Sequence, residues 1–244
     1  MSDFHLHPHH HAPPHDHHVE EHFTNSIFVT DVVLGMSDGL TVPFALAAGL
    51  TGAVAASSIV LTAGIAEIVA GSIAMGLGGF LAGQTEVEHY QSEMAREYDE
   101  VKRVPEVEKR EIRELLAEYG ITETTQHLVA EELAQHPERW VDFMMKFELN
   151  LEKPDERRAS KSALTIGLSY VVGGLIPLSP YFFFPDSHEA LLYSAFVTLI
   201  CLFVFGYFKS KATGQSPWQG ALKVALIGTL AASAAYGVAK LFGA

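Results

Sequence analysis

The chain alternates between long apolar stretches and segments dense in charge. Each of five apolar stretches has close to the roughly 20 residues that a helix needs to cross a bilayer. Two of them contain no charged residue, which argues against the buried helices of a soluble all-α protein. The pattern predicts an all-α integral membrane protein with five transmembrane helices per subunit, at Ile27–Leu50, Ala55–Gly83, Ser162–Phe184, Ala190–Phe208 and Gly220–Phe242.

Charged residues concentrate between the second and third apolar stretches. Residues 84–160 hold 20 acidic and 11 basic side chains, and helix-breaking residues divide them at Pro105, Gly120, Pro137 and Pro154. Because no proline interrupts residues 55–104, the second span is expected to continue as the first helix of this segment. The predicted organisation is a His-rich acidic tail without regular structure (1–26), transmembrane helices one and two (27–83), an acidic helical domain (84–160) and transmembrane helices three to five (161–244).

Basic residues near the span ends predict the orientation. They flank the third and fourth spans at Arg157, Arg158, Lys161, Lys209 and Lys211, whereas the turns at 51–54 and 185–189 contain neither Lys nor Arg. Cytosolic loops carry the excess of Lys and Arg in membrane proteins. The N-terminus and residues 84–160 are therefore expected in the cytosol and the C-terminus on the far side, with Lys240 as the one opposing charge.

Three carboxylates lie within the first two predicted spans, which contain neither Lys nor Arg: Asp31, Asp38 and Glu67. A charged side chain near the bilayer centre costs about 2.5–3.5 kcal/mol on insertion scales, so it marks a functional position by default. Pro43 must also free the carbonyl of Gly39 from its helical bond. In a broken helix, that carbonyl and the Asp38 carboxylate can together coordinate a cation.

Met75 follows Glu67 by eight residues and so shares its helix face. A carboxylate with a thioether suits a borderline-soft transition metal better than Na⁺, Mg²⁺ or Ca²⁺. Two simpler explanations stay open, since Asp31 can be an interfacial residue at the start of its span and Met75 can serve packing alone. A row of small residues on the second span favours close helix contact: Ala70, Ala74, Gly78 and Ala82.

Glutamates form two stripes at helical spacing after the second span: Glu86, Glu93, Glu97 and Glu100, then Glu108, Glu111, Glu114 and Glu118. Like charges at these spacings repel, so the stripes are either solvated or neutralised by a cation. Glu148 follows Met144 and Met145 by four and three residues. Thioethers beside a carboxylate can complete a metal site, although methionine in a Phe-rich amphipathic helix is more often part of a core.

Composition excludes several other functions. The chain has 16 Lys and Arg against 29 Asp and Glu, a net charge of −13, and residues 1–95 contain no Lys or Arg, so no nucleic-acid partner is expected. The single Cys201 cannot form an internal disulfide. Nine histidines before Phe23 can chelate transition metals or be dispensable. Glu86 and His89 have the Glu-x-x-His spacing of di-iron sites, but such a site needs two of these motifs.

The segments Ser37–Leu50, Ile65–Glu67, Ser72–Gly79 and Asp142–Glu148 resemble the vacuolar iron transporter family. The resemblance implies a homodimer of five-span subunits, with a metal path lined by the first two helices at the dimer interface and a three-helix cytosolic metal-binding domain. Carried onto this chain, the translocation path comprises Asp38, Glu67 and Met75, with Asp31 as a companion. The implied cytosolic metal ligands are Glu97, Glu100, Glu108, Glu111, Met144, Met145 and Glu148.

The leading hypothesis is a proton-coupled exporter that moves Fe²⁺, and also Mn²⁺ or Co²⁺, out of the cytosol. A carboxylic acid binds a proton more readily in a low-dielectric setting than in water, so Glu67 can hold either a proton or a metal. The chain is not expected to be an enzyme or to need a cofactor beyond the metal it transports. Its expected membrane is vacuolar in a eukaryote and the cell membrane in a bacterium. The alternative is a membrane-anchored protein that oxidises or stores iron, using Glu86, His89 and the acidic helices.

Overall fold

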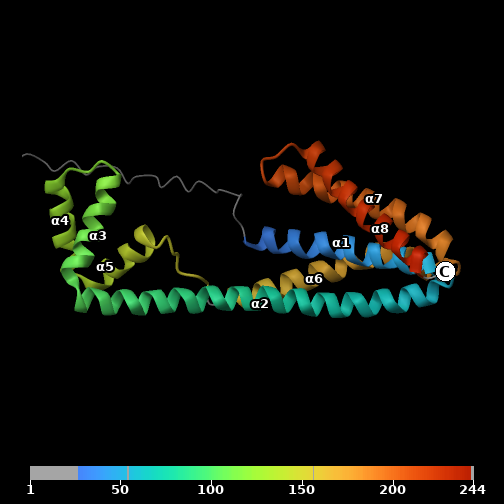
Figure 1. Cartoon of the computed structure of the whole chain (residues 1–244), viewed down its shortest axis with the longest axis horizontal. Helices are drawn as coiled ribbons and strands as arrows, with labels where there is room; N and C mark the ends of the chain where they lie inside the picture. Colours follow the sequence, from blue (N-terminus) through green and yellow to red (C-terminus); the bar gives the residue numbers. More distant parts are fainter. Residues whose placement is uncertain (1–26, 54, 156, 243–244) are drawn as a thin grey trace, which may run out of the picture.

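The computed structural model describes residues 27–53, 55–155 and 157–242, and this part of the chain is helical, with one isolated bridge pairing Ala56 with Asp186. Five helices are long and apolar enough to cross a membrane, which confirms the predicted all-α class and the five spans. They are α1 (Ile27–Ala53), α2 (Ser57–Arg103), α6 (Arg158–Leu178), α7 (Ser187–Ala212) and α8 (Pro217–Phe242) (Figure 1).

The third span is shorter as an α-helix than the predicted Ser162–Phe184. It ends at Leu178 and continues as the 3-10 turn η3 (Ser179–Phe182). Pro180 has no N–H to donate to the α-helical ladder, which explains the change of helix type. Beyond η3, Ser57 N–H donates to the Pro185 carbonyl, so the turns that follow the first and third spans lie at the same end of the bundle.

Helix α6 packs against both α1 and α2, while the α7–α8 hairpin contacts the opposite side of α1 (Figure 1). Glycines permit the close crossing of α1 and α6. A Cβ on Gly39 of α1 would lie 2.9 Å from the Tyr170 Cα, and one on Gly173 of α6 would lie 3.0 Å from the Leu40 backbone nitrogen. The two backbones are therefore in direct contact, as small residues allow in membrane helices.

Helix α2 runs unbroken for 47 residues, about 70 Å, which confirms that the second span continues into the acidic segment. At its end follow α3 (Pro105–Glu118), α4 (Glu123–Ala134), α5 (Pro137–Phe143) and the π-helical turn η2 (Met144–Glu148). The boundaries fall at the predicted residues: Pro105 and Pro137 open helices, and Gly120 has φ = 75°. The assignment of residues 84–160 as a metal-binding domain stays a prediction.

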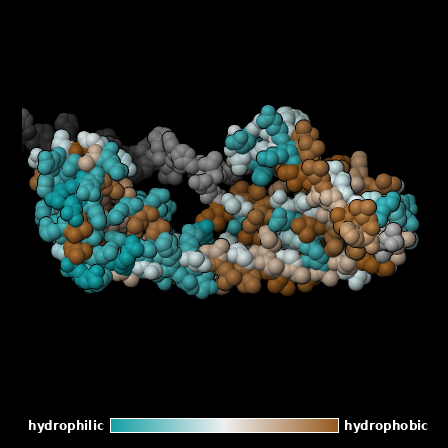
Figure 2. Space-filling view, viewed as in Figure 1, coloured by the Kyte–Doolittle hydropathy of each residue, from teal (hydrophilic) through white to brown (hydrophobic). Residues whose placement is uncertain are grey.

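The surface separates into two regions (Figure 2). Apolar side chains cover most of the five-helix part, and hydrophilic ones cover most of α3, α4 and α5. Leu192 and Phe196 of α7 are 73% and 66% exposed. Outward-facing apolar side chains of this size suit hydrocarbon rather than water.

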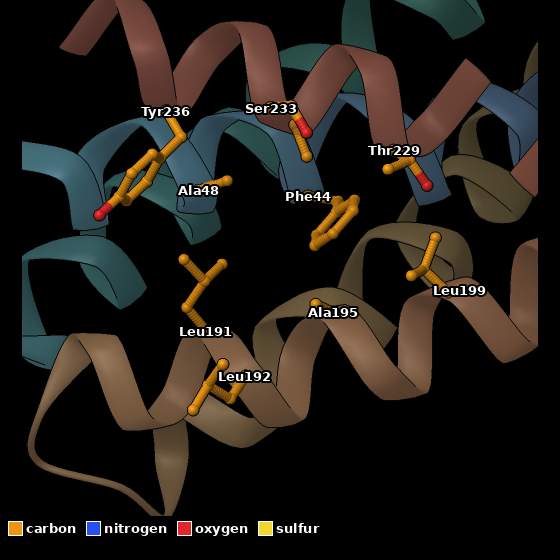
Figure 3. Close-up of a pocket in the computed structure, with 10 residues that line it drawn as sticks. Phe44, Ala48, Leu191, Leu192, Ala195, Leu199, Thr229, Ser233 and Tyr236 are labelled. Carbon is orange, nitrogen blue, oxygen red and sulfur yellow. The ribbon is translucent and has the colours of Figure 1, made fainter. Parts of the chain in front are cut away.

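An apolar pocket of about 330 Å³ lies between α1, α7 and α8 (Figure 3). Phe44 and Ala48 of α1, Leu191 of α7 and Tyr236 of α8 are among its lining residues. None of the predicted path carboxylates lines it. The pocket is therefore a packing gap or lipid-facing cleft, separate from the polar side chains of α1 and α2.

The His-rich tail, residues 1–26, lies outside the described residues. Its predicted lack of regular structure and its metal-chelating role stay predictions.

We expect Gly39→Ala to lower the free energy of unfolding by about 1–3 kcal/mol, because its methyl group meets the backbone of α6, which cannot move aside without displacing Tyr170. Thermal unfolding of the detergent-purified chain measures the effect. Gly237→Ala on α8 is the matched control, since a Cβ there meets nothing within 4 Å. Equal midpoints for the two variants would contradict the close α1–α6 crossing.

Candidate functional sites

Glu67, in the apolar half of α2, is hydrogen-bonded to a tyrosine of α6. The Tyr170 hydroxyl donates a short hydrogen bond to Glu67 Oε1, across 103 residues of sequence. Tyr170 is 2% exposed. The second carboxylate oxygen, Oε2, is buried without a hydrogen-bond partner among the described residues. Since unpaired buried polar atoms are costly, Oε2 is a position where a proton or a cation would be stabilising.

Two glycines make room for the Tyr170 ring. A Cβ on Gly71, one turn after Glu67, would lie 2.5 Å from the Tyr170 hydroxyl oxygen and 2.6 Å from the ring carbon that bears it. Gly39 of α1 meets the backbone of the same tyrosine. Tyr170 is thus enclosed between α1 and α2, and its hydroxyl has little freedom to leave Glu67.

Asp38 lies beside this pair. It is half-buried on α1, next to Gly39, and its carboxylate interacts electrostatically with the Tyr170 hydroxyl. The structure therefore places two of the predicted path residues, Asp38 and Glu67, within electrostatic range of one hydroxyl group, which is hydrogen-bonded to Glu67 alone among the described residues. Their role in carrying a metal stays a prediction.

The expected break in the first span is not present. Helix α1 runs from Ile27 to Ala53 with Pro43 buried inside it. A proline removes one helical hydrogen bond, but the surrounding helices can hold the backbone in place. Gly173 provides such support, because its Cβ position lies 3.1 Å from the Met36 carbonyl oxygen, one to two turns before the proline.

The other two path candidates lie elsewhere on the same helices. Asp31, one turn into α1, lines a pocket of about 290 Å³ together with Asp155, Arg158 and Lys161. This places it at the charged end of the spans, as in the interfacial alternative. Met75 is half-buried, two turns after Glu67 on α2.

The acidic stripes of α2 and α3 converge. Glu97, Glu100 and Glu108 each have a carboxylate oxygen within 4.8 Å of the others. Glu97 and Glu108 are only 2% and 3% exposed, so the solvated-stripe alternative does not describe them. Oxygen ligands at this spacing can hold a divalent cation.

Burial and mutual repulsion perturb this cluster. Desolvation, followed by the charges of Glu148 and Glu100, raises the pKa of Glu97 to about 7. Desolvation, followed by the charges of Glu111 and Glu97, raises the pKa of Glu108 to about 7. The pKa of Glu148 is also raised, first by burial. Five of the seven predicted ligands therefore form one electrostatic unit, which holds protons near neutral pH when no cation balances its charge.

Arg96 is a member of this unit that the sequence did not single out. Its guanidinium lies 2.7 Å from Glu93 and 3.8 Å from Glu100. Its charge lowers the pKa of Glu97 and of Glu148, against the larger opposing effect of burial. The i, i+4 spacing of Arg96 and Glu100 on α2 was the available sequence signal.

Met144 and Met145 occupy the apolar core next to the cluster. They are 1% and 2% exposed and pack with Tyr90, Ile112 and Trp140. Their burial agrees with the alternative that these methionines belong to a hydrophobic core. Their role as metal ligands stays a prediction. They begin the π-helical turn η2, which also carries Glu148. Such turns often occur at functional sites.

The arrangement of Glu86 and His89 does not favour the di-iron alternative. Glu86 of α2 forms an ion pair with Arg158 of α6, and His89 Nδ1 lies 3.8 Å from Glu93. Glu86 thus joins two helices, and no second Glu-x-x-His motif faces it within the described chain.

Known proteins are similar to this chain over most of its length. A model of the VIT family matches residues 29–240. The chain is 55% identical to vacuolar iron transporter 1 of Oryza sativa subsp. japonica over 226 residues, 93% of this chain and 90% of that protein. It is 54% identical to vacuolar iron transporter 1 of Arabidopsis thaliana, with the same coverage. Protein CCC1 of Saccharomyces cerevisiae is 38% identical over 224 residues, 88% of this chain and 69% of that protein.

We expect the affinity of the full chain for Mn²⁺ to fall about 100-fold between roughly pH 8 and pH 6, about ten-fold for each of Glu97 and Glu108, because both take up protons near pH 7 and must release them to bind a cation. Calorimetry in detergent measures this change. Glu97→Gln should weaken binding at both pH values, and the exposed Glu118→Gln should not. Affinity independent of pH would show that the cluster is not the binding site.

Proposed function

The chain belongs to the VIT family, and its plant relatives are named as vacuolar iron transporters rather than enzymes; we propose that it moves Fe²⁺ from the cytosol into a vacuole in exchange for protons. The single observation that carries this proposal is the half-buried Glu67 side chain, whose Oε1 accepts a hydrogen bond from Tyr170 and whose buried Oε2 has no partner among the described residues. The unpartnered oxygen of such a carboxylate can bind either a proton or a metal ion.

Exchange at Glu67 follows from this arrangement. When Oε2 holds a proton, the carboxyl group is neutral and compatible with its apolar surroundings. When Fe²⁺ arrives, Oε2 releases the proton and binds the cation, while the Tyr170 hydroxyl keeps Oε1 in place. Asp38, which interacts electrostatically with the same hydroxyl, supplies the second negative charge that a divalent ion needs. Met75 provides a softer ligand further along α2.

The acidic cluster acts as the collecting site in this proposal. Glu97 lies thirty residues after Glu67 on the same unbroken helix, about 45 Å away. The carboxylates of the cluster attract divalent cations, which then move toward the membrane path. Carboxylate and thioether ligands accept several first-row metals, so Mn²⁺ and Co²⁺ belong to the proposed substrates. The orientation, with this cluster in the cytosol, rests on the Lys and Arg distribution.

We further propose that two copies pair through α2. The small residues Ala70, Ala74, Gly78 and Ala82 form an exposed row, and a Cβ on Gly78 would meet nothing within 4 Å. Small residues repeated every four positions let two membrane helices approach closely. Pairing along this face would place the half-buried Glu67 and Met75 near the subunit interface.

We expect Glu67→Ala and Asp38→Ala each to reduce Fe²⁺ uptake into proteoliposomes by at least about ten-fold under an imposed pH gradient, because each removes a charge that the divalent ion needs. Glu189→Ala, an exposed carboxylate at the far turn, is the matched control and should transport normally. Normal uptake by the Glu67 variant would refute the path. Uptake without accompanying proton movement would refute exchange.

For the dimer, a cysteine at Ala74 or Gly78 in a Cys201→Ser background should cross-link two copies on oxidation in membranes, since facing Cα atoms on close helices fall within disulfide reach. A cysteine at Leu230, which is 68% exposed on α8, is the control and should stay monomeric. Cross-linking only at Leu230 would place the interface on α8 instead. Gel electrophoresis without reductant gives the readout.

A further inference from the structure

The turn between α7 and α8 carries positive charge that no carboxylate of the described residues neutralises. Lys209 and Lys223 line a pocket of about 360 Å³ at this turn, together with hydroxyl and amide side chains that include Ser216 and Gln219. No acidic side chain lines this pocket. Figure 2 shows a hydrophilic patch over this turn, bordered by apolar surface.

Two basic residues at the neighbouring end of α6 have carboxylate partners. Arg158 pairs with Glu86, and Lys161 pairs with Asp155. By contrast, no described carboxylate lies within ion-pair distance of Lys209 or Lys223. The pocket is therefore complementary to an anion that the described residues do not supply.

The lining changes from polar to apolar along α8. Gln219, Lys223 and Ile227 succeed one another at four-residue spacing on one helix face, and Ile227 is 52% exposed. Eight residues of helix span about 12 Å. From the turn into the membrane-spanning part, α8 thus presents an amide, then an ammonium group, then an apolar side chain. A phospholipid presents its headgroup, phosphate and acyl chain in the matching order.

Helix ends at the turn also favour an anion. Pro217 opens α8, and the N–H groups of the next residues have no acceptor within the helix, which leaves a partial positive charge there. At the end of α7, the Lys209 and Ser210 carbonyls accept bonds from Thr213 and Gln215 N–H at 3.1 and 2.8 Å. The negative end of α7 is thus capped within the turn.

We propose that this pocket binds the phosphate of an anionic phospholipid, with an acyl chain lying along Val224 and Ile227. The site is separate from the carboxylates of α1, α2 and α3 and goes beyond cation transport. The α7–α8 hairpin diverges from α1 toward this turn and meets it at the other end (Figure 1). A lipid seated here therefore stabilises the hairpin at the end where α1 does not support it.

Native mass spectrometry of the full chain in detergent tests the proposal, with phosphatidylserine and phosphatidylcholine as probes. We expect one phosphatidylserine to bind in preference to phosphatidylcholine. Lys209→Gln or Lys223→Gln should weaken it about five-fold each and the double variant about 25-fold, from about 1 kcal/mol per basic residue. Lys211→Gln is the matched control, because it removes the same charge from the same turn but does not line the pocket.

Three results would overturn the proposal. Equal losses for Lys211→Gln and Lys209→Gln would indicate diffuse attraction to charge rather than a site. Unchanged binding in the double variant would place the lipid elsewhere. Displacement of phosphatidylserine by an equal concentration of glycerol phosphate would indicate a site for a soluble anion, because the acyl chain would then add no affinity. The Lys223→Gln variant alone decides the question if the double variant does not fold.

Discussion

A carboxylate among apolar helices must find a partner, and in this chain the partner of Glu67 is the hydroxyl of Tyr170. The contact joins α2 to α6 and depends on Gly71 for space. Gly39 brings α1 against the same tyrosine, which places Asp38 beside it. The crossing of three helices is thus organised around one polar contact. Because that contact satisfies only one Glu67 oxygen, the other is left for a proton or a metal.

The length of α2 connects this contact to the acidic cluster. One helix of 47 residues carries Glu67 in its apolar half and Glu97 and Glu100 in its polar half. The apolar and polar halves of α2 use different solutions to reduce the free-energy cost of a buried negative charge. Glu67, in the membrane half, accepts a hydrogen bond from a neutral hydroxyl, whereas in the cluster the pKa values of Glu97 and Glu108 are raised to about 7. Both solutions leave a group that a divalent cation can neutralise.

Hydropathy and helix breakers were sufficient to predict the spans, the continuation of α2 and the boundaries at Pro105 and Pro137, because these depend on local composition. Helical spacing predicted the two glutamate stripes, whereas the grouping of Glu97 and Glu100 with Glu108 came from the family resemblance, because it depends on how α3 packs against α2. Tyr170 was not predicted, since its partner lies 103 residues away and only helix packing brings them together. The continuity of α1 through Pro43 was missed for the same reason, because support from α6 is tertiary. Spacing alone likewise did not decide whether Met144 belongs to the core.

The central claim is that Glu67 exchanges a proton for a metal ion while Tyr170 holds it in place. Infrared difference spectroscopy of the reconstituted chain, recorded before and after Fe²⁺ addition without oxygen, tests it most directly. The account predicts the loss of a protonated-carboxyl band on metal binding, absent in Glu67→Gln and shifted in Tyr170→Phe, where the hydrogen bond is removed. An identical band in the wild-type chain and in Glu67→Gln would contradict it, because the proton released would then belong to another group.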